Sequence, residues 1–142
     1  MKLVQHLLDV KGREVTTISP DATVLDAVRL MAEKSIGALV ILDGEKLQGM
    51  VSERDYARKV ILKGLASDDI PVSAIMRQDP AVASSGSTIQ ECMSMVTEGR
   101  VRHLPVVDDG KVTGIISIGD LVKAIIADQQ AEIEQLGQYI SG

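Results

Sequence analysis

The chain contains an internal repeat, which constrains its fold more than any other feature. At an offset of 65 residues, segment 23–57 aligns with segment 88–122 without a gap, and eight aligned positions are identical. Most other aligned positions exchange one apolar residue for another. Such a repeat indicates two copies of one supersecondary unit with pseudo-twofold symmetry. The identical pairs are Thr23 and Thr88, Glu33 and Glu98, Leu39 and Leu104, Asp43 and Asp108, Lys46 and Lys111, Gly49 and Gly114, Ser52 and Ser117, and Asp55 and Asp120.

Each copy has the local pattern of a helix, a β-hairpin and a second helix. A threonine followed three residues later by an acid forms a capping box, which predicts a helix start at Thr23 and at Thr88. Short β-rich runs separated by Asp-Gly turns follow and predict the hairpins. Ser52 and Ser117, each three residues before an aspartate, predict the next helix starts. The predicted hairpin strands are 38–42, 48–51, 104–107 and 113–116, and one further short strand per copy is predicted at 15–19 and 81–84.

These elements predict an α+β fold built from two β-α-β-β-α repeats. A three-stranded sheet of this size cannot bury a core alone, so we expect the two repeats to pack sheet to sheet and to form two related clefts. The expected divisions are a docking helix at 1–14, repeats at 15–62 and 80–126, a linker with a short helix at 63–79, and a helical extension at 127–142. The expected C-terminal helix carries an interrupted apolar stripe of Leu121, Ile125, Ile133, Leu136 and Ile140.

The composition argues against several classes of protein. One cysteine and two histidines are too few for a four-ligand zinc site or a disulfide framework. No apolar run approaches about 18 residues and no signal-peptide pattern is present, so we expect a cytoplasmic protein without a membrane partner. The net charge of −5 argues against a nucleic-acid partner. With two Tyr and no Phe or Trp, any bound ring must be held by aliphatic side chains.

The strongest functional pattern is Gly-x-x-Ser-x-x-Asp, which occurs at Gly49–Asp55 and again at Gly114–Asp120. A helix N-terminus and a serine hydroxyl favour a phosphate, and an aspartate one turn later can accept from two ribose hydroxyls. The pattern therefore suggests a nucleotide. Ser-x-x-Asp is also a plain capping box, however, and would appear in a repeat that binds nothing. The nearby cations Arg54, Arg100 and Arg102 favour a phosphate, although a solvated surface would also carry them.

Three single residues have simpler interpretations. Cys92 lies on an apolar helix face and predicts a small buried core residue rather than a redox site. His6 lies among leucines and valines, which favours a packing role. His103 follows Arg102, and a ligand contact and a structural role stay open for it. The six methionines are interpreted as core filler.

The chain resembles the CBS-domain (cystathionine β-synthase domain) family, specifically a tandem pair called a Bateman module. The resemblance rests on the two Gly-x-x-Ser-x-x-Asp motifs, the strand at 102–108 and the capped helices before each hairpin, and it covers nearly the whole chain. The chain is most similar to small bacterial stand-alone CBS-pair proteins that share the segments MAEKSIGALVI, SERDYARKV and RHLPVVDDGK. Relatives in that group bind AMP and NAD.

The resemblance implies AMP or NAD(H), with ATP as a further candidate, bound in clefts between the repeats. We expect no catalytic residue and no metal ligand in this chain. In one cleft Asp120 would hold the ribose, Ser117 and Gly119 would face the phosphate, Arg102 and His103 would approach the phosphates, and adenine would be enclosed by Val15, Thr16, Ile36, Gly37 and Ile115. The other cleft would use Met50, Ser52, Arg54, Asp55, Ala81, Val101 and Arg102.

The two implied clefts differ in charge. Arg54 of the first motif aligns with Gly119 of the second. Ala38 is the remaining implied binding residue. Gly37 and Ala38 align with Arg102 and His103, respectively. We therefore expect the clefts to prefer different nucleotides or different numbers of phosphates.

The favoured function is a non-catalytic regulatory module that senses energy or redox state through adenine nucleotides and acts as a homodimer. An alternative is an interaction module that regulates a partner enzyme, with nucleotide as modulator. A nucleotide-hydrolysing enzyme is less favoured, because the chain has no Walker-type loop, no metal-ligand cluster and no nucleophile placed with a base.

Overall fold

The structure is a computed structural model that describes residues 2–141, with side chains to residue 138. It divides into two compact units, each described here by itself. The first-repeat unit comprises residues 14–80 and 109–112, and the second-repeat unit comprises residues 1–13, 81–108 and 113–142. Met1, Gly142 and the side chain of Ile140, which belong to the predicted terminal segments, lie outside the described residues.

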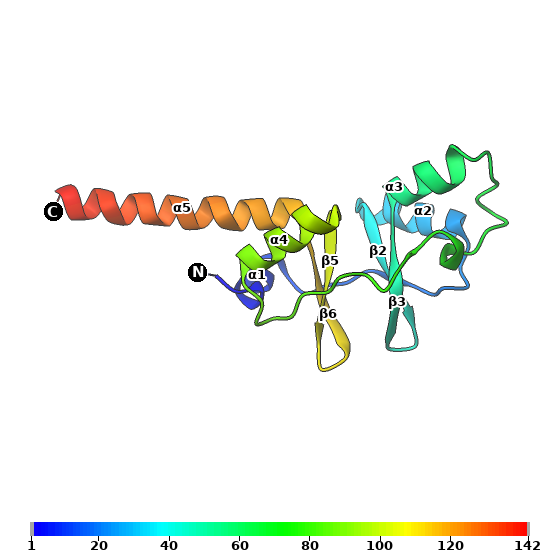
Figure 1. Ribbon diagram of the computed structural model, residues 1–142, viewed down its shortest axis with the longest axis horizontal. Helices are drawn as coiled ribbons and strands as arrows, with labels where there is room; N and C mark the ends of the chain where they lie inside the picture. Colours follow the sequence, from blue (N-terminus) through cyan, green and yellow to red (C-terminus); the bar gives the residue numbers. More distant parts are fainter. Residues whose placement is uncertain (1, 142) are drawn as a thin grey trace. The chain divides into compact units, whose positions relative to one another are not determined.

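The first-repeat unit is built on a four-stranded sheet in the order β1-β2-β3-β4. Figure 1 labels its two central strands, β2 and β3. The predicted hairpin is confirmed as the antiparallel pair β2–β3, and β1 adds in parallel to β2. The fourth strand was not predicted: β4 comes from the linker and pairs Arg77 with Met50 and Gln78 with Gly49. The elements are β1 (Thr17–Ile18), α2 (Val24–Lys34), β2 (Ala38–Asp43), β3 (Lys46–Ser52), α3 (Glu53–Tyr56), the π-helix η1 (Ala57–Ile61), the 3-10 helix η2 (Val72–Ala74) and β4 (Arg77–Gln78).

The second-repeat unit has a two-stranded hairpin, β5–β6, with three helices around it (Figure 1). The predicted hairpin is present, and helices lie within the segments predicted to be helical at the two ends of the chain. The elements are α1 (Val4–Lys11), α4 (Ile89–Gly99), β5 (His103–Asp108), β6 (Lys111–Ser117) and α5 (Ile118–Ser141).

The strand predicted at 81–84 is reduced to a single parallel bridge between Ala83 and Val106. In the first repeat the Val40 amide donates to the carbonyl oxygen of Thr16 at 3.2 Å, which extends the ladder. The residue aligned with Val40 is Pro105, which has no N–H to make that bond. A proline in β5 therefore explains why the second copy lacks the counterpart of β1.

Local backbone geometry repeats between the copies. Thr23 and Thr88 each accept from the amide three residues later and complete the predicted capping boxes. Both capped helices also end in the left-handed conformation at aligned positions, with φ 54° at Ser35 and 52° at Arg100. The repeat seen in the sequence is thus a repeat of backbone geometry.

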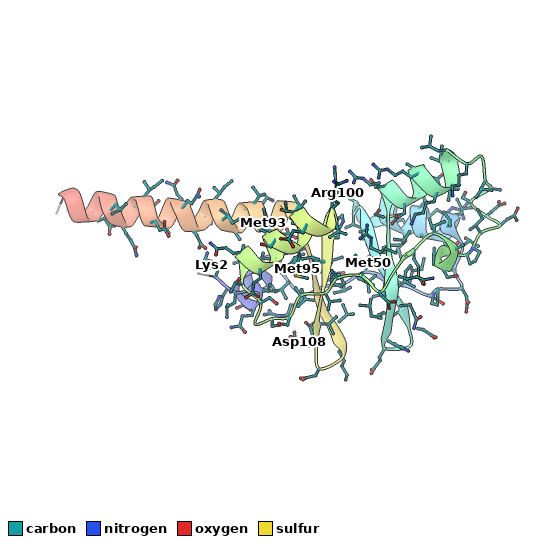
Figure 2. All side chains as sticks on the ribbon, viewed as in Figure 1. Lys2, Met50, Met93, Met95, Arg100 and Asp108 are labelled. Atoms are coloured by element: carbon teal, nitrogen blue, oxygen red, sulfur yellow. The ribbon has the colours of Figure 1, made fainter. Side chains whose placement is uncertain are left out.

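Each unit has its own cluster of buried apolar side chains. Leu39, fully buried on β2, belongs to the cluster of the first-repeat unit, and the aligned Leu104 on β5 belongs to that of the second. Figure 2 labels Met93 and Met95 on α4, and both are partly buried against the second cluster, as expected of core filler.

Cys92 and His6 have different outcomes. Cys92 is fully buried, as predicted, and burial followed by the charge of Glu91 raises the pKa of its thiol to about 11. The thiol is therefore protonated at neutral pH and a poor nucleophile. The packing role expected for His6 is wrong: the residue is exposed, and its Nδ1 accepts from the Leu3 amide at 3.1 Å, so it helps to cap α1.

The long helix α5 packs against α1 and α4 through its first turns, and its C-terminal half extends beyond them (Figure 1). Leu121 of the predicted stripe is fully buried, whereas Ile133 and Leu136 are each 61% exposed. None of the described helices is both long and apolar enough to cross a membrane.

Candidate functional site

The two Gly-x-x-Ser-x-x-Asp motifs form equivalent strand-to-helix corners. In the first, the Ser52 amide donates to Asp55 Oδ2 at 2.9 Å and the Asp55 amide donates to Ser52 Oγ at 3.2 Å. In the second, the Ser117 amide donates to Asp120 Oδ2 at 2.8 Å and the Asp120 amide donates to Ser117 Oγ at 3.1 Å. Both predicted capping boxes are confirmed. The motif was interpreted either as a nucleotide site or as a plain capping box. Both interpretations require these contacts, so the contacts alone do not distinguish them.

A third residue joins each corner at an aligned position. The Glu53 amide donates to the carbonyl oxygen of Gly37 at 3.0 Å, and the Ile118 amide donates to that of Arg102 at 2.9 Å. Gly37 therefore lies beside the first motif and Arg102 beside the second. The start of each hairpin and the start of the following helix are held together in both copies.

Each motif aspartate is paired with a lysine that was not predicted from the sequence. Lys59 Nζ lies 3.3 Å from Asp55 Oδ1, one helical turn away, and donates to the carbonyl oxygen of Ile75 at 2.9 Å. Lys11 Nζ lies 2.6 Å from Asp120 Oδ2 and also donates to the carbonyl oxygen of Ile115 at 2.6 Å. The spacing of Asp55 and Lys59 could have indicated their pair. No local sequence pattern indicates the pair of Lys11 and Asp120, because these two residues come from opposite ends of the chain.

The second motif has a distinctive electrostatic environment. Burial is the largest single effect on the pKa of Asp120 and would raise it. The hydrogen bond from Lys11, the hydrogen bond from the Ser117 amide and the charge of Lys11 together outweigh burial. The pKa of Asp120 is therefore lowered below its ordinary value. The carboxylate is therefore ionised at neutral pH and acts as an acceptor. The hydrogen bonds from Lys11 and from the Ser117 amide both end on Oδ2 of this carboxylate.

A second carboxylate of the same unit, Asp108, lies at the end of β5 and is labelled in Figure 2. Its pKa is also lowered. The Ser85 hydroxyl donates to Asp108 Oδ2, the Ser85 amide donates to Oδ1 at 3.0 Å, and the Thr113 hydroxyl donates to Oδ2 at 2.7 Å. These bonds favour the ionised form. They join β5, β6 and the segment before α4.

Acid should destabilise the second-repeat unit. Asp108 and Asp120 have folded-state pKa values below their ordinary 3.8, so the stability they contribute is complete above that value and is lost as the pH falls through the folded pKa. We expect the free energy of unfolding in urea to fall between pH 5 and pH 3, and to fall less for Asp108→Asn. Asp109→Asn, at the exposed neighbouring position, is the control. Equal acid sensitivity of Asp108→Asn and the unsubstituted chain would contradict this account.

The predicted binding residues divide between the units. Each cleft implied by the resemblance draws on both units, so its assembly stays a prediction. Within their own units, Ala38 and Met50 are buried on β2 and β3, whereas Arg54, Gly119 and Arg102 are exposed. The first-repeat unit carries Val15, Thr16, Ile36, Gly37, Ala38, Met50, Ser52, Arg54 and Asp55, and the second-repeat unit carries Ala81, Val101, Arg102, His103, Ile115, Ser117, Gly119 and Asp120. In residues 2–138, no group of three His, Cys, Asp or Glu side chains is placed to hold a metal ion.

Known proteins share this architecture. The chain is 35% identical over 127 residues to the CBS domain-containing protein CBSX3, mitochondrial, of Arabidopsis thaliana; the match covers 86% of this chain and 62% of that protein. The solved structure of a candidate signal-transduction protein with CBS domains from Burkholderia ambifaria is 46% identical, with a TM-score of 0.85, and the match covers 90% of this chain and 96% of that one. A hexameric CBS-CP12 protein from bloom-forming cyanobacteria is 28% identical, with a TM-score of 0.77 over 86% of this chain and 70% of that one.

The family assignment follows from the match to the CBS-domain model, which finds that domain twice, at residues 8–62 and 72–127. The two matches include both capped helices, both hairpins and both strand-to-helix corners. The chain therefore belongs to the CBS-domain family and consists of two consecutive CBS domains.

Proposed function

We propose that this chain is a non-catalytic regulatory module that binds adenine nucleotides at its two Gly-x-x-Ser-x-x-Asp corners. The observation that carries the proposal is the doubled corner, in which a half-buried aspartate is held at the start of a helix beside a serine and a lysine. AMP and NAD(H) are the proposed ligands, with ATP as a third.

The chemistry of the corner suits a nucleotide. An ionised carboxylate accepts from the two vicinal hydroxyls of a ribose, and the amides and serine hydroxyl at a helix start favour a phosphate. The lysine beside each aspartate, Lys59 or Lys11, adds a cation within reach of the same ligand. Aliphatic side chains such as Met50 and Ile115 would enclose the base, since the chain has no Phe or Trp.

Regulation by ligand binding is the role that fits such a site. A nucleotide that favours one arrangement of the two repeats would shift the population of that arrangement and so signal its presence. We further propose that the working form is a homodimer, supported by the exposed apolar residues of α5 and by the hexameric assembly of the related CBS-CP12 protein. A regulated partner protein is compatible with this role.

Isothermal titration calorimetry with AMP, ADP, ATP, NAD and NADH tests the proposal. We expect at least one of them to bind with a Kd below about 1 mM, the weak limit of specific binding. Asp55→Asn should remove binding at the first motif and Asp120→Asn at the second, because each substitution removes a charged ribose acceptor. Asp26→Asn is a matched control, since Asp26 occupies the same capping-box position in α2 and belongs to neither motif.

Failure of all five nucleotides to bind would overturn the proposal. Equal loss of binding in Asp26→Asn and Asp55→Asn would show that the substitutions act through helix capping alone. Native mass spectrometry of the purified chain reports the number of protomers and any retained nucleotide, and a monomer with no ligand would contradict both parts of the proposal. Chromatography after prolonged incubation with AMP, ATP or NAD would reveal turnover, which would contradict a non-catalytic role.

A further inference from the structure

An exposed apolar stripe runs along α5 and continues past residue 127, where the second CBS-domain match ends. α1 and α4 pack against the first turns of the helix, and its C-terminal half extends beyond them (Figure 1). Lys2 Nζ lies 3.2 Å from Asp128 Oδ1, and every side chain from residue 129 to residue 138 is exposed. The exposed apolar members of the stripe are Val122, Ile126, Ile133 and Leu136.

The stripe has the spacing of a coiled-coil seam. An a/d stripe is narrower than the apolar face that packs a helix onto a globular core, and it is typical of contact between two helices. Isoleucine at a, here Ile126 and Ile133, with leucine at d, here Leu136, favours two parallel strands. The members alternate at intervals of four and three residues: Val122 (d), Ile126 (a), Gln129 (d), Ile133 (a) and Leu136 (d).

The exposed half of α5 needs a packing partner to remain helical. The helix continues to Ser141 although Gly137 lies within it, and glycine in a helix interior costs about 1 kcal/mol relative to alanine. Helices shorter than about 12–15 residues are marginal in water without tertiary packing. Among the described side chains from residue 129 to residue 138, none is buried. A second helix along the stripe would supply the missing packing.

Charge and polarity favour a second copy of this chain as that partner. Residues 127–138 contain Asp128, Glu132 and Glu134 and no lysine or arginine, so an anionic membrane or a nucleic acid would be repelled. Gln129 is the single polar residue among the five seam positions. Its amide can both donate and accept, so an identical residue is a complementary partner for it.

The same polar and charged residues select the orientation. In an antiparallel pair that matches all the seam positions, Gln129 would face Ile133 of the second copy, and its buried amide would be unpaired. Glu132 would lie beside Glu132 of the second copy. In a parallel pair, Gln129 meets Gln129. Glu132 at g then faces the e position five residues later, which is Gly137 and carries no charge.

We propose that the C-terminal halves of α5 from two copies of this chain pair as a parallel, in-register coiled coil. The inference rests on the homodimer of the proposed function and adds the surface and the orientation through which the copies meet. The seam lies on a different face of α5 from Asp120, which contacts Lys11 of α1. The copies therefore stay paired whether or not the motifs hold a nucleotide.

Disulfide cross-linking of the full chain tests the orientation. Leu136→Cys and Ile126→Cys should each give a covalent dimer on mild oxidation, because identical seam positions meet in a parallel, in-register pair. Ala131→Cys is the matched control: it is exposed on the opposite side of the helix and should stay monomeric on a denaturing gel. The native Cys92 does not interfere, because its side chain is fully buried.

Sedimentation equilibrium tests the surface. Ile133→Glu places two like charges in the seam and should raise the Kd of the dimer at least about tenfold. Gln135→Glu adds the same charge at an exposed position outside the seam and should leave this Kd unchanged. The double variant Asp55→Asn, Asp120→Asn should dimerise like the unsubstituted chain. Thermal unfolding curves establish that each variant is folded.

The outcomes separate this inference from the proposed function. If Ile126→Cys and Leu136→Cys cross-link to each other but not to themselves, the helices are antiparallel and the inference falls while the homodimer stands. If Ile133→Glu leaves the Kd unchanged, the copies meet through another surface and the inference also falls. If the unsubstituted chain is a monomer, the inference and the homodimer fall together, and nucleotide binding is decided separately by calorimetry.

Discussion

Leu39→Ala and Leu104→Ala should each lower the free energy of unfolding by about 2–5 kcal/mol, the range for a buried leucine truncated to alanine. The two leucines occupy aligned positions on β2 and β5, and each is fully buried within the apolar cluster of its own unit. Truncation removes apolar contacts and leaves a cavity that β-sheet packing cannot easily close. Urea unfolding measures the loss.

The location of the damage is also predicted. In amide hydrogen exchange, Leu39→Ala should reduce protection mainly in the first-repeat unit and Leu104→Ala mainly in the second. Leu62→Ala, at a position that is 78% exposed after η1, is the matched control and should change stability little. An identical exchange pattern for Leu39→Ala and Leu104→Ala would mean that the two clusters open as one cooperative unit.

Gly49→Ala should be the most damaging single substitution among the glycines without positive φ. A Cβ added at Gly49 would lie 2.5 Å from the backbone carbonyl oxygen of Arg77 in β4. Because a strand backbone cannot move aside without breaking its pairing with β3, we expect a loss of about 3 kcal/mol, the upper part of the range for overpacking. The measurement is again urea unfolding.

Gly114, the aligned glycine, provides the comparison. A Cβ there would lie 2.8 Å from Leu8 Cδ1 and 2.9 Å from Leu8 Cδ2, which are side-chain atoms rather than backbone atoms. Gly114→Ala should therefore cost less, about 1 kcal/mol. Gly86→Ala, where the nearest atom is Ser84 Oγ at 4.0 Å, is the neutral control. A larger loss for Gly114→Ala than for Gly49→Ala would contradict this explanation of the motif glycine.

Most secondary structure could be predicted because it depends on local rules. Capping boxes at Thr23, Ser52, Thr88 and Ser117 involve residues three apart, and the sequence displays them directly. The hairpins are equally local. β4 was missed because residues 77–78 have no strand pattern of their own and are ordered only by pairing with Gly49 and Met50. The strand predicted at 81–84 failed because of Pro105, which lies in the strand against which that segment would pair.

The candidate site could be predicted only in part, because the sequence displays its local contacts but not its tertiary contacts. The motif serines and aspartates were found because each corner is local. The lysines were missed, and Lys11 was beyond prediction: it contacts Asp120 only because α1 packs against α5.

The sequence by itself determined the repeat, the capped helices, the hairpins and the family, because all of these depend on residue types at short, fixed spacings. Tertiary structure alone decided which neighbour each repeated position meets. Gly49 lies against the backbone of β4, whereas Gly114 lies against the side chain of Leu8 in α1. Asp55 pairs with Lys59, one helical turn further along the chain, whereas Asp120 pairs with Lys11 from the far end of the chain. The physical reason is that aligned residues share backbone geometry, whereas their contacts come from segments that are not part of the repeat.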